Sequence, residues 1–414
     1  MTLKNIFWGF SYCLLLWQCD AKITSEKKQN PTTNPIEITA EKTVKVGAAR
    51  LDAYLDQILD KNVALVVNQT STIGSTHLAD TLLSLGVQIQ QIFAPEHGFR
   101  GKADAGEKVV DGIDGKTGIP LVSLYGKNKK PSPKQLEGID VVVFDIQDVG
   151  ARFYTYISTL HYVMEACAEN GVAVLVLDRP NPNGHYIDGP ILEADYQSFV
   201  GMHPIPVVHG MTIAEYAQMV NGEGWLKDGI QCQLTTVSCQ NYNHETVYEL
   251  PIKPSPNLPN NRSIYLYPSL CFFEGTVFSV GRGTNSQFQV FGHPDFQKGD
   301  YTFIPQPMEG AKYPKLEGDS CRGFDLTKLP LENIREARTL NLDYLIMAYQ
   351  NYPNPEEFFL KNLFFDRLAG GKRLRKQIIA GKTAAEIKQS WQRDLNQFKK
   401  TRAKYLLYDA ALPR

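Results

Sequence analysis

Short apolar runs alternate with amphipathic segments through the first half of the chain, and this order restricts the fold more than any other feature. Five runs have the length and composition of buried strands: residues 63–67, 87–93, 120–124, 141–144 and 172–177. Three segments beside or between them carry apolar residues at helical spacing: 51–59, 77–85 and 159–169. Regular alternation of this kind predicts an α/β fold, with a doubly wound parallel sheet and crossover helices on both of its faces.

The pattern changes towards the middle of the chain. A sixth short strand is predicted at 205–208, followed by a helix at 212–220, where Thr212 and Glu215 have the spacing of a capping box. After Trp225 come loops rich in Pro and Asn, aromatic strands at 263–267 and 275–280, and late helices near 331–350 and 384–398. This change predicts a smaller α+β domain, with the first domain spanning residues 45–228 and the second 229–414.

The N-terminal residues have the pattern of an export signal. Lys4 precedes an apolar stretch, residues 6–17, that suits a signal peptide of residues 1–19 and is short for a membrane span. Cys19 lies where a lipoprotein signal places its acylated cysteine, although the residues before it are larger than usual; simple cleavage and release is the alternative. Residues 20–44 are polar and are expected to form a flexible linker. We therefore expect an exported protein, periplasmic or anchored to the outer membrane as a lipoprotein.

Charge and motif content argue against several function classes. The chain has 43 Lys and Arg residues against 44 Asp and Glu, and no long basic run, so we expect no nucleic-acid partner and membrane contact only through a lipid anchor. The residues after the first strand, 68–72, lack the Gly-rich turn of a nucleotide-binding enzyme, and no serine nucleophile elbow or zinc-binding His-Glu-x-x-His helix is present. We expect no cofactor and no metal site. The five cysteines of the body match no zinc spacing and are expected to be buried as small apolar residues.

Polar side chains follow almost every predicted strand. Because the carboxyl ends of parallel strands meet at one edge of a sheet, these side chains should surround a single concavity suited to a polar ligand. In chain order they include Asn68, Glu96, His97, Tyr125, Asp145, Asp148, Asp178, Arg179, Asn183 and His209. Each of them alone could equally be a helix cap or a turn residue.

Two carboxyl groups suffice for hydrolysis of a glycosidic bond, and this edge offers candidates for both. Glu96 is the candidate general acid, because partial burial after a strand favours the protonated form of a glutamate; a turn-forming carboxylate is the alternative. Asp145, directly at a strand end, is preferred over Asp148 as the second catalytic carboxylate. Either aspartate could instead pair with Arg152 and organise the loop.

The segment after these aspartates has side chains of the kind that hold sugars. Arg152, Tyr154 and Tyr156 combine a guanidinium with phenol rings and hydroxyls, which can bind a sugar and any carboxylate on it. His97 and His209 could bind hydroxyls or be hydrogen-bonded core histidines.

Several motifs resemble the NamZ-type exo-β-N-acetylmuramidases, a family formerly catalogued as a domain of unknown function. The matching segments are Asn68-Gln69-Thr70, Ala94 to Gly101, Asp145 to Tyr156, Asp178 to Pro182, Gly189-Pro190, Pro206 to Thr212, Phe273 to Thr276 and Gly281 to Thr284. The resemblance covers the body from about residue 45 to the end. Together with the export signal, it implies a lipoprotein member of the Bacteroidetes type.

The resemblance implies a Rossmann-like domain joined to a smaller one, with the active site in the cleft between them. The implied reaction is exo-cleavage of non-reducing terminal N-acetylmuramic acid from peptidoglycan fragments, in wall turnover or salvage. The Pro-Glu-His-Gly motif supplies Glu96, and Glu274 could face it across the cleft. Arg152, Arg179 and Arg282 are candidates to bind the lactyl carboxylate of muramic acid, although each could be structural.

The expected substrate-binding set also includes other side chains of these motifs: Asn68, His97, Asp148, Tyr154, Tyr156, Asp178, Asn183 and His209. The expected partners are muramyl saccharides derived from peptidoglycan, and the oligomeric state is left open. Two rival functions also stay open: a surface lipoprotein that binds muramyl sugars without cleaving them, and a cell-wall esterase or amidase.

Overall fold

The structure, a computed structural model, describes residues 43–96, 98–99 and 111–408. The predicted signal peptide, Cys19 and His97 lie outside the described residues, as does nearly all of the predicted linker. No helix in the described ranges has the length and hydrophobicity needed to cross a bilayer.

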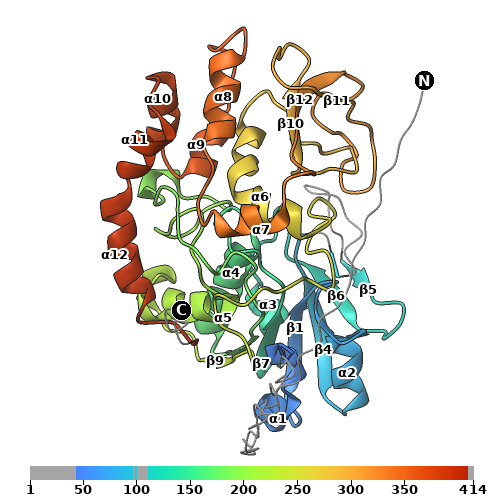
Figure 1. Cartoon of the computed structure of the whole chain (residues 1–414). Helices are drawn as coiled ribbons and strands as arrows, with labels where there is room; N and C mark the ends of the chain where they lie inside the picture. Colours follow the sequence, from blue (N-terminus) through green and yellow to red (C-terminus); the bar gives the residue numbers. More distant parts are fainter. Residues whose placement is uncertain (1–42, 97, 100–110, 409–414) are drawn as a thin grey trace, which may run out of the picture. The chain divides into compact units, whose positions relative to one another are not determined.

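A seven-stranded sheet forms the centre of the first part of the chain (Figure 1). Its strands are β1 (Asn62–Val67), β4 (Gln88–Ala94), β5 (Gly112–Ile113), β6 (Pro120–Ser123), β7 (Val141–Asp145), β8 (Ala173–Leu177) and β9 (Leu234–Val237). They lie in the order β5-β6-β4-β1-β7-β8-β9, and all neighbours are parallel except β5 and β6. Without β5 this is the strand order of the Rossmann fold, in which ligands bind outside the carboxyl ends of the strands. The predicted doubly wound α/β fold is confirmed.

Helices cover both faces of this sheet, as the sequence predicts. They are α1 (Leu51–Tyr54), α2 (Leu78–Ser84), α3 (Pro133–Leu136), α4 (Tyr156–Asn170) and α5 (Ile213–Gly222), with the 3₁₀ helices η1 (Gly47–Ala49), η2 (Leu55–Gln57), η3 (Ala194–Tyr196) and η4 (Lys227–Gly229). Neighbouring residues of β1 point to opposite faces: Leu65 packs in the core that contains α2, and Val66 in the core that contains α4 and α5. Thr212 and Glu215 form the predicted capping box at the start of α5.

The C-terminal part has the smaller α+β architecture that the sequence predicts. An antiparallel sheet of order β10-β12-β11 consists of β10 (Val290–His293), β12 (Cys321–Asp325) and β11 (Tyr301–Phe303). The helices are α6 (Asn261–Leu270), η5 (Cys271–Gly275), α7 (Leu331–Glu336), α8 (Asp343–Asn351), α9 (Phe364–Ala369), α10 (Arg373–Ile379), α11 (Ala384–Gln389) and α12 (Gln392–Arg402). Outside this C-terminal part, β2 (Thr72–Ile73) and β3 (Thr76–His77) form a small antiparallel ribbon that follows β1 in the chain.

Three of the predicted strands are wrong. Residues 263–267 lie in α6, whose N-terminus is capped by the side chain of Asn260. Residues 275–280 and 205–208 contribute only isolated β-bridges. A short apolar run can form either a strand or a buried helix. When all of its side chains are buried, its hydrophobic pattern does not distinguish the two. The sequence also does not predict β9, which extends the first sheet beyond residue 228.

The cysteines in the described part of the chain are buried and unpaired, which confirms their expected role as small apolar residues. They are Cys167, Cys232, Cys239, Cys271 and Cys321. Cys232 and Cys239, the closest pair in the body sequence, form no disulfide.

Candidate active site

The turn after β4 presents Glu96 at the carboxyl edge of the sheet. Gly98 has the left-handed φ of 74° and donates its backbone N–H to the carbonyl of Pro95 at 2.9 Å, which closes the turn. The Glu96 carboxylate accepts hydrogen bonds from the hydroxyls of Tyr125, at 2.9 Å, and Thr155, at 3.0 Å. Tyr125 follows β6 and Thr155 precedes α4, so three loops at this edge meet at one carboxylate.

Glu96 lines a cavity of about 240 Å³ to which both parts of the chain contribute. The predicted site residues among its lining are Glu96, Tyr154, Tyr156, Glu274 and Arg282. Phe153, Tyr267 and Phe288 add aromatic walls. The cavity therefore contains two carboxylates, a guanidinium and ring faces, which are groups suited to binding and cleaving a sugar.

Two tyrosines form the wall next to Glu96. The Tyr154 hydroxyl donates to the carbonyl of Pro254 at 2.8 Å, and the Tyr154 ring meets that of Tyr156 edge to face, with centroids 5.0 Å apart. Burial raises the pKa of both hydroxyls, so both stay neutral. Because the Tyr154 hydroxyl already donates its hydrogen bond to the carbonyl of Pro254, Tyr154 offers a ligand mainly its ring.

Glu274 enters the cavity from the C-terminal part. It lies in η5 and forms an ion pair with Arg282, whose Nε is 2.7 Å from Oε1. Lys315 supports the same turn, because its ammonium donates to the carbonyls of Phe273, at 3.1 Å, and Glu274, at 3.3 Å. Burial lowers the pKa of Lys315 to about 8. Arg282 thus fixes the Glu274 carboxylate and Lys315 fixes its backbone.

Some residues of this cavity are not among the predicted catalytic or substrate-binding residues. Tyr125 and Thr155 hold the Glu96 carboxylate, and their positions, directly after a strand and next to a predicted tyrosine, were signals available in the sequence. Ser255 and Asn257 line the cavity from a Pro- and Asn-rich loop that carries no motif. Only the folded chain brings that loop to the edge of the sheet.

Asp145, predicted as the second catalytic carboxylate, does not reach this cavity. Its fully buried carboxylate forms a bidentate ion pair with Arg179, with Nε–Oδ1 at 2.5 Å and Nη2–Oδ2 at 2.8 Å. Neither residue is part of the cavity lining. The structure therefore places both charges in a buried pair, where each neutralises the other.

Arg152, predicted to bind a carboxylate, is also directed away from the cavity. Its fully buried guanidinium donates to the carbonyls of Pro190, at 2.8 Å, Ile205, at 2.7 Å, and Leu368, at 2.9 Å. Gly370 approaches the guanidinium so closely that a Cβ there would lie 2.6 Å from Nη2. These contacts match the alternative in which Arg152 fixes loops through backbone carbonyls, and they join the first part of the chain to α9.

We expect Arg152→Lys to lower the free energy of unfolding by about 2–3 kcal/mol, because one ammonium cannot reach all the carbonyls that the planar guanidinium spans. Urea-induced unfolding measures the difference. Arg338→Lys is the matched control, since Arg338 pairs with Glu245 at the surface and its replacement should cost less than about 1 kcal/mol. Equal, small losses in both variants would contradict a structural role for Arg152.

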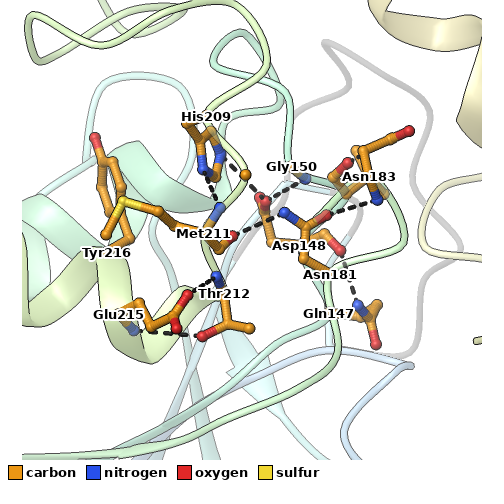
Figure 2. Close-up of polar contacts among 12 residues, drawn as sticks. Gln147, Asp148, Gly150, Asn181, Asn183, His209, Met211, Thr212, Glu215 and Tyr216 are labelled. Carbon is orange, nitrogen blue, oxygen red and sulfur yellow. Dashed lines mark hydrogen bonds and ion pairs between the residues drawn. The ribbon is translucent and has the colours of Figure 1, made fainter. Parts of the chain in front are cut away.

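Asp148 and His209 belong to a buried polar cluster and not to the cavity lining (Figure 2). Asp148 accepts the backbone N–H of Gly150 at 2.6 Å, and its Oδ2 lies 3.9 Å from Nε2 of His209. His209 Nδ1 accepts the backbone N–H of Met211 at 3.3 Å, so the proton of the neutral ring is on Nε2 and faces Asp148. Among the described residues, neither Nε2 of His209 nor Oδ1 of Asp148 has a hydrogen-bond partner.

This burial predicts a pH dependence of stability. It raises the pKa of Asp148 to about 7, whereas an exposed aspartate titrates near ~4, and it lowers the pKa of His209 to about 3. Between ~4 and ~7 the folded state keeps a proton on Asp148 that the unfolded state releases, so this group destabilises the fold increasingly as pH rises through that window.

The difference in free energy of unfolding between Asp148→Asn and the wild type should therefore shift in favour of the variant by about 1–3 kcal/mol as the pH rises from about 5 to about 8. Urea unfolding of both proteins at each pH measures this difference, and all other titrating groups cancel in it. A difference that stays constant with pH would show that Asp148 is ionised throughout.

Three other predicted residues fix backbone turns. Asn68 Oδ1 accepts a backbone N–H two residues on, at 2.9 Å, in an Asx turn. Asp178 accepts the backbone N–H of Ala214 at the start of α5, at 3.0 Å, and Asn183 Nδ2 donates to the carbonyl of Val149 at 2.8 Å. All three are buried and absent from the cavity lining.

Comparison with known proteins decides the family. Residues 63–262 match the N-terminal domain, and residues 265–408 the C-terminal domain, of the family described as exo-β-N-acetylmuramidase NamZ. The chain belongs to the NamZ family. A relative, the peptidoglycan β-N-acetylmuramidase NamZ of Bacillus subtilis, is 39% identical over 379 residues, which cover 86% of this chain and 89% of the relative.

Two solved structures are similar to this NamZ-family chain. Both are crystal structures of DUF1343 family proteins from Bacteroides fragilis. One is 48% identical with a TM-score of 0.83 and covers 89% of this chain and 99% of its own. The other is 29% identical with a TM-score of 0.73 and covers 88% of this chain and 99% of its own.

A second, larger cavity of about 460 Å³ is lined by residues that include Trp225, Leu374 and Trp391. Of the predicted site residues that the structure describes, none lines it. Within the described ranges, no three His, Cys, Asp or Glu side chains are grouped so that they could hold a metal ion. The smaller cavity around Glu96 is therefore the candidate active site of this NamZ-family chain.

Proposed function

We propose that this chain is an exo-acting glycosidase that releases non-reducing terminal N-acetylmuramic acid from peptidoglycan fragments. The observation that carries the proposal is the cavity in which Glu96 and Glu274 come together with Arg282 and aromatic walls. Its volume of about 240 Å³ suits one substituted monosaccharide, as an enzyme acting on chain ends requires. Membership of the NamZ family and the activity named for the Bacillus subtilis relative support the same reaction.

In this proposal Glu96 is the general acid, and its proton passes to the glycosidic oxygen of the leaving sugar. Glu274 takes the place of Asp145 as the second carboxylate, because it lines the cavity whereas Asp145 is paired with Arg179. The bond between the anomeric carbon of muramic acid and the glycosidic oxygen breaks, the hydroxyl of water ends on that carbon, and the remaining proton of water replaces the one that Glu96 gave up. Arg282 holds Glu274 and, among the described lining residues, supplies the guanidinium for the lactyl carboxylate.

The test is product analysis with oligosaccharides of defined ends. Folded protein is incubated with chains that carry either N-acetylmuramic acid or N-acetylglucosamine at the non-reducing end, and the products are identified by mass spectrometry. We expect free N-acetylmuramic acid from the first chain and no product from the second. Internal cleavage would contradict the exo mode. Binding without release would favour a sugar-binding lipoprotein, and loss of an acyl or amide group would favour an esterase or amidase.

We further propose that the protein is exported and anchored to a membrane through a lipid on Cys19. The support is the sequence, in which Lys4 and the apolar residues 6–17 precede this cysteine. Cell fractionation of the wild type and Cys19→Ala tests the anchor. The wild type should sediment with membranes and the variant should not; the same soluble distribution for both would leave cleavage and release as the explanation.

A further inference from the structure

The loop that connects β11 and β12, residues 304–320, is attached to the rim of the active-site cavity. Asn257, which lines the cavity, donates its side-chain amide to the carbonyl of Gly310 at 2.7 Å. Gln306 donates its backbone N–H to the carbonyl of Gly283, the residue after Arg282, at 2.8 Å. Two separate segments of the cavity wall therefore hold this loop.

The tip of the loop, residues 308–314, is held on both sides by backbone hydrogen bonds and packing. Met308 and Ala311 exchange backbone hydrogen bonds of 3.1 and 2.9 Å on one side of the tip. On the other side Pro314 packs on Gly283, where an added Cβ would lie 2.7 Å from the proline ring. Lys315, the next residue, bonds the backbone of Glu274. The tip is thus placed by the same residues that position the cavity's ion pair.

Tyr313 lies at this tip and is 92% exposed, whereas its neighbour Pro314 is buried. An aromatic ring so exposed adds almost nothing to the stability of the fold, because it removes little apolar surface from water. A tyrosine has only two side-chain torsions, so it offers a ligand a large amphipathic contact area at low cost in conformational entropy. Its place on a loop that is hydrogen-bonded to the cavity wall therefore suggests a binding role.

We propose that Tyr313 is a stacking platform for the sugar on the leaving side of the scissile bond, and that it sets the preference for oligosaccharides over simple glycosides. This inference rests on the proposed glycosidase function. A cavity that holds one monosaccharide leaves the next sugar outside its mouth, where the apolar face of a pyranose can lie on an aromatic ring. Tyr313 acts on substrate binding and does not touch the bond that breaks.

The experiment compares two substrates: the disaccharide of N-acetylmuramic acid and N-acetylglucosamine, and the methyl β-glycoside of N-acetylmuramic acid, which lacks the second sugar. Tyr313→Ala should lower kcat/KM for the disaccharide about three- to tenfold, through a higher KM, and leave the methyl glycoside unchanged. Tyr313→Phe should keep the wild-type values, because stacking needs the ring and not the hydroxyl. Ile379→Ala, which removes a half-exposed apolar side chain from α10, is the control and should change neither substrate.

Equal losses on both substrates, or no loss on the disaccharide, would overturn the platform. If the wild type cleaves both substrates and Tyr313→Ala does so equally well, the platform fails and the glycosidase stands. If the folded wild-type protein cleaves neither substrate, the proposed glycosidase function is wrong, and so is the proposed role of Tyr313 that rests on it.

Discussion

Replacing Glu96 by glutamine is expected to lower kcat/KM for the muramic acid–glucosamine disaccharide by about 10²–10⁴-fold, the usual contribution of a general acid. Glutamine has nearly the same shape as glutamate but cannot donate a proton to the leaving oxygen. Its carbonyl can still accept the hydroxyl of Tyr125, and its amide can donate to Thr155, so the local structure should be kept. Initial rates of sugar release, with thermal unfolding as a check on folding, measure the effect.

The leaving group separates acid catalysis from other roles of Glu96. A dinitrophenyl glycoside of N-acetylmuramic acid leaves without protonation, so Glu96→Gln should lose much less activity on it than on the disaccharide. Tyr125→Phe removes one hydrogen bond to Glu96 and is the matched control, expected to cost no more than about tenfold on either substrate. A Glu96→Gln enzyme with undiminished activity on the disaccharide, or with equal losses on both substrates, would exclude Glu96 as the acid.

Replacing Asp145 by asparagine is expected to lower the free energy of unfolding by about 3–5 kcal/mol, because it leaves the Arg179 guanidinium buried without its counter-charge. The side chain of Arg179 is only 3% exposed and cannot turn to solvent without disturbing the sheet edge. Denaturant unfolding measures the loss. In conditions where the variant stays folded, its kcat for the disaccharide should be close to that of the wild type.

A double variant tests the reason for this loss. Asp145→Leu combined with Arg179→Met removes both charges and should recover much of the stability, since an apolar pair of similar size has no desolvation cost. A folded Asp145→Asn protein with the wild-type unfolding midpoint and no activity would instead restore Asp145 as a catalytic residue. Loss of stability without recovery in the double variant would point to packing and not to charge.

The positions of the central strands were predictable because they depend on local composition. The parallel strands β1, β7 and β8 are short buried runs rich in Val and Leu, whereas β9 has two threonines at its centre and was not predicted. The capping box of Thr212 and Glu215 requires only a spacing of three residues. Strand 263–267 failed because its aromatic residues are buried in a helix, where the same run of side chains satisfies the core. The local pattern therefore predicts which segments are buried more reliably than it predicts whether they form helices or strands.

The sequence by itself determined the doubly wound sheet and the edge at which polar residues gather, and it predicted Glu96, which lines the candidate active-site cavity. It could not determine which of those polar residues face the ligand. A side chain at a strand end can point into the crevice or towards the interior of the fold. Asp145 pairs with a buried arginine, Arg152 bonds backbone carbonyls, and Asp148 is buried in a polar cluster. Glu274 reaches the cavity because a second part of the chain packs against the sheet edge, and contacts between residues distant in sequence are decided by tertiary packing alone.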